Sequence, residues 1–455
     1  DLHSTSRRQR QMCIRDSHHM QEFRRGGDML NRPPHEAHIA EQLQHSIDGG
    51  SLKFDYFSPD EKNRLSVFAS AANTDRDSYY GPGNDPLKAY GKTTDLTAMG
   101  GAQYVHTFDK CFFMPSDLTA GLEYNRDRLK DNMWGYNRHT DQTVNIYSAF
   151  LQNEWKNDRW GILIGGRLDK HNLVNHVIFS PRANLRYNPT ENINLRFSYS
   201  SGFRAPQAFD EDLHVENVGG NVAMVELADN LKEERSQSLS VSANIYHRFG
   251  AFQVNFLVEG FYTKLSDVFA LTDGEIVDGI LTRTRYNAPG ARVMGLTLEG
   301  KMAYLTKFQL QAGITLQQSH YSEPHVWNKE APAVKKMMRT PNTYGYFTAT
   351  YTPIKPLSIA LSGTYTGSML VPHEPVPGFL EKPITVNTKD FFDIGLKAAY
   401  DFKLYKSMNL QVNAGVQNIF NAYQNDFDKG ADRDSGYIYG PSLPRSFFAG
   451  VKISY

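Results

Sequence analysis

Apolar and polar residues alternate along most of this chain, from about Ala40 to the last residue. In segment 118–125, leucine, alanine and tyrosine take every second position, and threonine, glycine, glutamate and asparagine take the others. A two-residue period places the two kinds of side chain on opposite faces of a strand. Helical periodicity is nowhere sustained over a comparable length. The pattern therefore predicts an all-β chain.

We expect about seventeen strands, many of them near the ~9–11 residues that a tilted strand needs to cross a bilayer. The predicted strands cover residues 38–57, 62–79, 92–109, 116–131, 140–157, 159–172, 177–188, 191–201, 235–249, 251–271, 281–305, 306–321, 341–353, 356–370, 388–403, 407–419 and 442–455.

The connections between these strands are alternately short and long. Short ones such as SPDEK after Phe57 and NPTEN after Tyr187 carry turn residues. The long ones are residues 80–91, 132–139, 202–234, 272–280, 322–340, 371–387 and 420–441. Membrane barrels have short periplasmic turns and long extracellular loops, so this order favours a transmembrane antiparallel up-and-down β-barrel.

Alternation alone also fits a soluble protein whose apolar face meets a core. Three features favour the membrane barrel. About seventeen strands are too many for one open sheet, and helices that could cover a sheet are missing. The polar face carries charged residues that suit a wet lumen: Lys53, Glu123, Arg196, Lys397 and Lys452. Closure also removes the unpaired sheet edges that hydrocarbon does not tolerate.

Composition narrows the function classes. The chain has 25 Tyr and 27 Phe but only 4 Trp, and it has no run of ~20 apolar residues that could form a membrane helix. Lys plus Arg equals Asp plus Glu at 49 each, so no overall charge attracts nucleic acid, which we do not expect as a partner. Two cysteines, Cys13 and Cys111, leave little room for a disulfide framework or a thiolate metal site.

Residues 1–17 differ from the rest of the chain. They are basic and polar, lack the apolar core of a secretory signal, and lack the two-residue period. They resemble translated cloning sequence joined to a truncated gene. We therefore set residues 1–17 aside as non-native and treat residues 18–455 as one domain.

Several motifs resemble those of TonB-dependent outer-membrane receptors. They are the run NAGVQNIFN at 413–421 with Tyr423, the turn GPSLPR at 440–445 before a last strand that ends in Tyr455, and the segments SPRANLRYNP at 180–189, LRFSYSSGFRAP at 195–206 and LKEERS at 231–236. These motifs occur in the family's order, and the similarity covers most of residues 38–455.

The resemblance implies a 22-stranded barrel, of which this chain holds strands five to twenty-two, with the plug domain and first strands missing. Residues 18–30 would be the top of strand five. The protein would lie in the Gram-negative outer membrane, in contact with outer-membrane lipid. It would import a scarce, bulky ligand, a ferric siderophore or another metal chelate such as cobalamin or haem, with energy from the TonB complex. The barrel assembly machinery would recognise the strand that ends in Tyr455. Neither catalysis nor a resident cofactor is implied.

The ligand would dock among the extracellular loops, where aromatic and polar side chains offer contact area and hydrogen bonds. The candidates are Tyr79, Tyr80, Trp134, Tyr136, Arg204, Asp210, His214, Trp327, His373, Tyr437 and Tyr439. The aromatic ones also suit the girdle at the membrane interface. The carboxylates of Asp426, Asp428, Asp432 and Asp434 have a spacing that can bind calcium, although a solvated acidic loop fits them as well.

Two alternatives remain open. One is a glycan or oligopeptide importer of the same fold, which would need a partner surface lipoprotein. The other is a passive porin or an outer-membrane enzyme. Asp210, Asp212 and His214 place two carboxylates and an imidazole in the longest loop, but no nucleophile or metal-binding spacing accompanies them, which disfavours catalysis.

Overall fold

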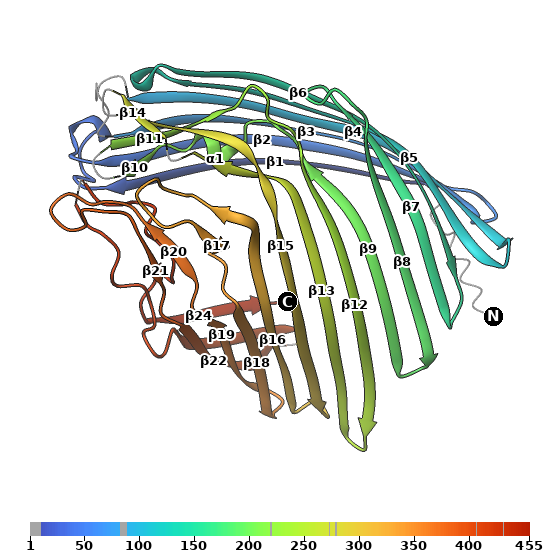
Figure 1. Cartoon of the computed structure of the whole chain (residues 1–455). Helices are drawn as coiled ribbons and strands as arrows, with labels where there is room; N and C mark the ends of the chain where they lie inside the picture. Colours follow the sequence, from blue (N-terminus) through green and yellow to red (C-terminus); the bar gives the residue numbers. More distant parts are fainter. Residues whose placement is uncertain are drawn as a thin grey trace, which may run out of the picture.

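The computed structural model describes residues 11–81, 89–218, 221–272, 274–277, 280–405, 407–430 and 432–455. These residues form one 22-stranded sheet and a separate two-stranded sheet. The long strands of the large sheet pair antiparallel with their neighbours in chain order, and its short strands β10, β11, β14 and β17 lie in the long connections (Figure 1). The all-β prediction is confirmed.

The long strands are β1 (Gln11–Gly27), β2 (Ala40–Phe57), β3 (Asn63–Tyr80), β4 (Tyr90–Cys111), β5 (Met114–Met133), β6 (Arg138–Lys156), β7 (Trp160–His171), β8 (Ile178–Thr190), β9 (Ile193–Arg204), β12 (Glu234–Phe249), β13 (Phe252–Leu271), β15 (Ile280–Tyr304), β16 (Phe308–His325), β18 (Thr343–Ile354), β19 (Leu357–Thr366), β22 (Phe391–Tyr405), β23 (Met408–Gln417) and β24 (Ser446–Ser454).

Each strand predicted from the alternation is present. The largest difference in a strand's start is at the C-terminus, where the predicted strand 442–455 begins only at Ser446. Pro444 stands just before it and has no N–H for the ladder with β23. Strand β1 includes residues 18–27, which fall in the segment expected as the top of strand five. It also includes residues 11–17, which pair with residues 50–56 of β2 although we had set them aside. Their non-native origin stays a prediction.

The two faces of the strands differ as the pattern predicts. In β2, Leu52, Phe54 and Tyr56 are exposed, whereas the neighbouring Asp55 is fully buried. Asp55 accepts a hydrogen bond from Arg64 (3.1 Å) on the adjacent strand. The same arrangement recurs on other strands, for example at Leu122, Leu151 and Ile164, which are more than half exposed. So large an outward apolar surface suits contact with lipid.

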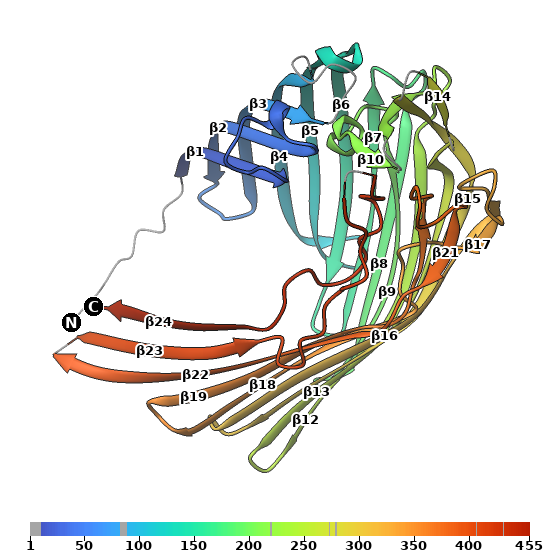
Figure 2. The ribbon, with the colours of Figure 1, turned by 90° about the vertical axis from the view of Figure 1, so that its left-hand side faces the viewer.

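The sheet curves into a deep trough whose first and last strands face each other across an opening (Figure 2). Within the described residues, no pairing joins β1 to β24. The curvature of a barrel is therefore present, and the predicted closure is not detected. In the same part of the chain, no helix is long and apolar enough to cross a membrane.

The strand connections alternate between the two ends of the sheet. Short turns, such as that between Phe249 and Phe252, lie at one end. There Gly250 has a φ of +57°, a conformation that glycine adopts without the steric cost of a Cβ. The long connections lie at the other end. Because the long loops of membrane barrels are extracellular, we take this end as the extracellular one.

Small elements stabilise the long connections, and the alternation did not predict them. They are η1 (Pro34–Glu36), η2 (Trp134–Tyr136), α1 (Asp210–Leu213), β10 (Glu216–Val218), β11 (Asn221–Leu227), β14 (Glu275–Val277), β17 (Val334–Lys336), β20 (Leu370–His373) and β21 (Ile384–Asn387). Strand β11 pairs in parallel with the outer part of β15. The loop after β9 is therefore tied to a strand well beyond its own neighbours.

Candidate functional site

A cluster of buried aromatic and aliphatic side chains lies at the extracellular end of β2, β3 and β5. Tyr79, Tyr80 and Tyr136 belong to it and are at most 4% exposed. The hydroxyl of Tyr136 donates a hydrogen bond to the backbone carbonyl of Tyr80. The ring of Tyr80 meets the imidazole of His214 edge-on, with centroids 5.3 Å apart. Tyr80 therefore contacts two other candidate ligand residues, Tyr136 and His214, although they are far apart in sequence.

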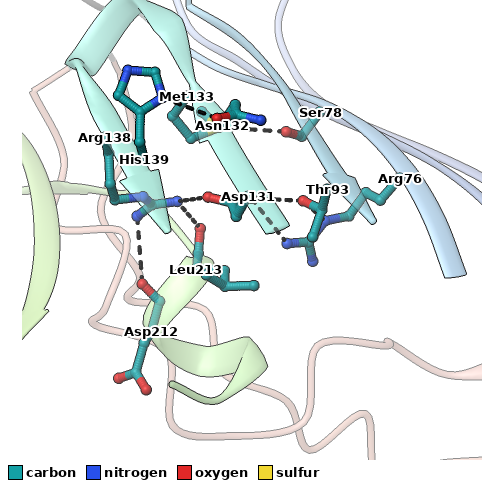
Figure 3. Close-up of polar contacts among 10 residues, drawn as sticks. All are labelled: Arg76, Ser78, Thr93, Asp131, Asn132, Met133, Arg138, His139, Asp212 and Leu213. Atoms are coloured by element: carbon teal, nitrogen blue, oxygen red, sulfur yellow. Dashed lines mark hydrogen bonds and ion pairs between the residues drawn. The ribbon is translucent and has the colours of Figure 1, made fainter. Parts of the chain in front are cut away.

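A buried carboxylate, Asp131, holds the loop after β9 in place (Figure 3). It accepts a hydrogen bond from the hydroxyl of Thr93 (2.6 Å) and one from the guanidinium of Arg138 (3.1 Å). Arg138 also donates to the backbone carbonyls of Asp212 (3.4 Å) and Leu213 (2.7 Å). The guanidinium of Arg76 lies 3.9 Å from Asp131 on the other side.

A second arginine secures the same loop from the opposite direction. Arg285, on β15, forms an ion pair with the carboxylate of Asp212, and both side chains are less than a tenth exposed. Helix α1 is thus fixed between β6 and β15, and His214 follows it directly. The side chain of the candidate Asp210 lies outside the described part of the structure.

The candidate Arg204 packs against aromatic rings. Its guanidinium carbon lies 4.0 Å from the ring centroid of Phe209 and 5.5 Å from that of Phe269. Such cation–π contacts stabilise the start of the loop after β9.

The candidates His373, Tyr437 and Tyr439 join the hairpin of β20 and β21 to the last long loop, residues 418–445. The rings of His373 and Tyr437 are stacked, with centroids 3.7 Å apart. His373 Nε2 lies 2.9 Å from a carboxylate oxygen of Asp428. The hydroxyl of Tyr439 donates to Asp426 at 2.6 Å. The carboxylates of Asp426 and Asp428 thereby help to order this loop.

Asp434 is buried in the same loop and accepts backbone N–H groups of Glu374 (2.9 Å) and Gly436 (2.8 Å). Burial raises the pKa of Asp434 despite these hydrogen bonds. Burial also raises the pKa of Glu374, which Arg283 (2.7 Å) and Asn328 (2.9 Å) contact.

The proposed calcium ligands do not surround a common point. Asp426, Asp428 and Asp434 each have protein partners, and Asp432 is exposed. Among the described residues, no group of three or more His, Cys, Asp or Glu side chains is arranged to hold a metal ion.

A cavity of about 430 Å³ lies where these parts meet at the extracellular end. Its walls come from the ends of β1, β2 and β3, the η2 turn, the loop after β9 and the last long loop. The lining residues include Ile39, Glu41, Tyr80, Tyr136, His214, Val215, Phe427, Asp428, Arg433, Asp434 and Ile438.

The other candidates are not among the described residues that line this cavity. Trp134 is 52% exposed, and Trp327 is buried in a different loop. His373 and Tyr437 contact the lining residues Asp428 and Asp434. The contacts of Tyr79 with Tyr90, of Arg204 with Phe209 and of Tyr439 with Asp426 are to residues outside the lining. Tyr455 follows the end of β24 and is fully exposed.

The sequence analysis did not identify Asp131, Arg138, Glu41 and Glu374 as residues of this site. The alternation along the strands does indicate Asp131 and Arg138, because it places both side chains on the inward face, one on each side of the η2 turn. Opposite charges at two inward positions of one hairpin indicate a buried pair. For Glu41 and Glu374 no comparable signal exists, since their partners are distant in sequence.

Comparison with known proteins agrees with this architecture. Residues 27–419 match the family model described as TonB dependent receptor-like, beta-barrel. No curated protein sequence matches the chain.

Solved structures share the fold at low sequence identity. The siderophore receptor PirA from Acinetobacter baumannii is 14% identical, with a TM-score of 0.67 over 91% of this chain and 67% of that one. The ferric-catecholate import receptor Fiu from K12 E. coli is 14% identical, with a TM-score of 0.64 over 90% of this chain and 64% of that one. The FrpB iron transporter from Neisseria meningitidis is 16% identical, with a TM-score of 0.68 over 96% and 70%.

The chain thus spans about two thirds of the length of these structures. The family's members are receptors and transporters of the Gram-negative outer membrane. The family match shows that this chain belongs to the TonB-dependent receptors, and the antiparallel order of its strands agrees with this.

Proposed function

We propose that the protein containing this chain imports a ferric siderophore or another metal chelate, such as cobalamin or haem, across the outer membrane. The observation that carries the proposal is the cavity of about 430 Å³ at the extracellular end, with Tyr80, Tyr136 and His214 in its wall. Ligand sites of this size combine apolar walls with a few convergent polar groups. The structures of similar fold include a siderophore receptor and a ferric-catecholate receptor, which supports an iron chelate.

The walls of this cavity are stabilised by contacts with residues outside the lining. Arg138 and Arg285 fix the loop that carries His214, and His373 fixes Asp428. A preorganised wall binds its ligand without a further ordering cost. We therefore assign direct ligand contact to Tyr80, Tyr136 and His214, and support to Arg204, His373, Tyr437 and Tyr439.

Uptake of radioactive iron tests this function. The receptor, produced from its complete gene, would be placed in a Gram-negative strain that lacks its own ferric receptors. We expect accumulation of a supplied iron chelate, and loss of that accumulation when TonB is deleted. Accumulation that continues without TonB would indicate passive diffusion and contradict the proposal.

We further propose that the sheet is closed in the membrane, since the N–H and C=O groups along open edges of β1 and β24 would have no partners in hydrocarbon. Hydrogen exchange of the receptor in lipid tests closure. We expect the amides of β24 to be as protected as those of the interior strand β5. Rapid exchange at every second residue of β24 would show an open edge.

A further inference from the structure

The cavity at the extracellular end has a charge balance that restricts its ligand. Its described walls contain three carboxylates, those of Glu41, Asp428 and Asp434, and one guanidinium, that of Arg433. The imidazole of His214 lies 3.5 Å from Glu41. The rest of the lining is aromatic, aliphatic or backbone. At neutral pH the walls therefore carry more negative than positive charge.

Four other arginines near this end are engaged with the protein itself. Arg138 contacts Asp131, Arg285 contacts Asp212, and Arg283 contacts Glu374. Arg339 donates a hydrogen bond to the backbone carbonyl of Ile438 (2.8 Å) behind the last long loop. None of these four guanidinium groups belongs to the described lining of the cavity. An anionic ligand would thus find Arg433 as its one guanidinium partner among the described walls.

Ferric chelates differ sharply in charge. A ferric tris-catecholate carries a net threefold negative charge, because each catecholate contributes two negative charges to the metal. A ferric trihydroxamate is neutral, because each hydroxamate contributes one. In a site partly shielded from water, like charges at close range disfavour binding more strongly than they do in bulk solvent.

We infer that this cavity binds a neutral or cationic chelate of the hydroxamate type, and that it discriminates against polyanionic chelates through Glu41 and Asp428. The inference rests on the proposed function. Phe427 and Ile438, whose side chains are exposed, supply the apolar surface that a neutral chelate covers, and the carboxylates supply the repulsion. Glu41 is the better group to test, because its side chain is about half exposed and its contact with His214 lies outside the last long loop.

Binding to the complete receptor in detergent tests the inference. The probes are the ferric complexes of a linear trihydroxamate and of a tris-catecholate of 2,3-dihydroxybenzoate, and the readout is the dissociation constant from calorimetry. We expect the trihydroxamate to bind at least about tenfold more tightly. The Glu41→Lys variant should reduce this preference by about tenfold, mainly by improving tris-catecholate binding.

Glu36→Lys is the matched control. Glu36 is exposed on η1, lies outside the cavity lining, and its replacement changes the net charge equally. It should leave the preference unchanged, whereas an equal effect of both variants would reduce the inference to overall charge and overturn it. Equal or tighter binding of the tris-catecholate by the unmodified receptor would overturn the inference and leave the proposed function intact. Failure of both ferric chelates, of cobalamin and of haem to bind would overturn the proposed function itself.

Discussion

The imidazole of His373 lies flat against the ring of Tyr437, with an angle of 7° between the two planes. One residue ends β20 and the other belongs to the last long loop, so the stack joins two loops that approach each other only in the folded protein. The adjacent contact between His373 and Asp428 brings the stack to the cavity wall.

Replacing His373 by alanine should loosen the last long loop. The change removes the stack and leaves the buried Asp428 carboxylate without the imidazole, at a cost of about 1–3 kcal/mol. Hydrogen exchange of the backbone amides in residues 420–441 would measure the loss. His139→Ala, at an exposed position on β6, should leave these amides unchanged. Unaltered exchange in the His373 variant would contradict the assigned contact.

The same group of loops should become easier to open as pH rises above the ordinary carboxyl pKa values of 4.5 and 3.8. The pKa of Glu374 and that of Asp434 are raised in the folded protein by burial, so the folded state holds these protons more tightly than the unfolded state. Their stabilising effect is complete below the unfolded values of 4.5 and 3.8 and is lost as pH rises through the folded values.

Hydrogen exchange across this pH range, corrected for intrinsic rates, would measure the effect on opening. Glu374→Gln should flatten the dependence, whereas Glu330→Gln, at an exposed position, should preserve it. A loop that instead becomes more protected toward neutral pH would contradict the assignment.

Arg138→Ala should release helix α1 from the wall of the sheet. The substitution leaves the buried Asp131 without its closest cation and frees two backbone carbonyls, at a cost of about 3–5 kcal/mol. We expect Arg138→Lys to restore little of this, because one ammonium cannot reproduce the forked contacts. A cysteine placed at position 215 would report the release through its rate of labelling. Lys130→Ala, on the same hairpin but facing outward, is the control, and equal labelling rates in both variants would contradict the role of Arg138.

Arginine in place of Leu151 should impair folding in the membrane, and arginine in place of the adjacent Gln152 should be tolerated. Leu151 is 56% exposed on the outward face, whereas Gln152 faces inward. A charge on the lipid face of a barrel costs up to about 2–4 kcal/mol near the midplane. Heat-modifiable mobility in gel electrophoresis would report the folded fraction. The reverse order of the two variants would invert the assignment of the faces.

The sequence alone predicted the strands well and the contacts between the loops poorly, for a physical reason. Leu122 and Glu123 point to opposite faces of their strand, because successive side chains alternate regardless of what lies beside the strand. The contact of Tyr80 with His214, and the parallel pairing of β11 with β15, depend on loops that cross the sheet. The sequence therefore placed these aromatic residues in loops, but their contacts with one another depend on the positions of distant partners.

The inward row of Arg76, Thr93 and Asp131 has a consequence for assembly. These residues stand opposite one another on β3, β4 and β5. If β5 slipped by one residue against β4, Asp131 would turn toward the outer surface, and Arg76 and Thr93 would lose it as a partner. The row therefore favours a single register, because a misaligned hairpin would place a carboxylate on the apolar face of the sheet.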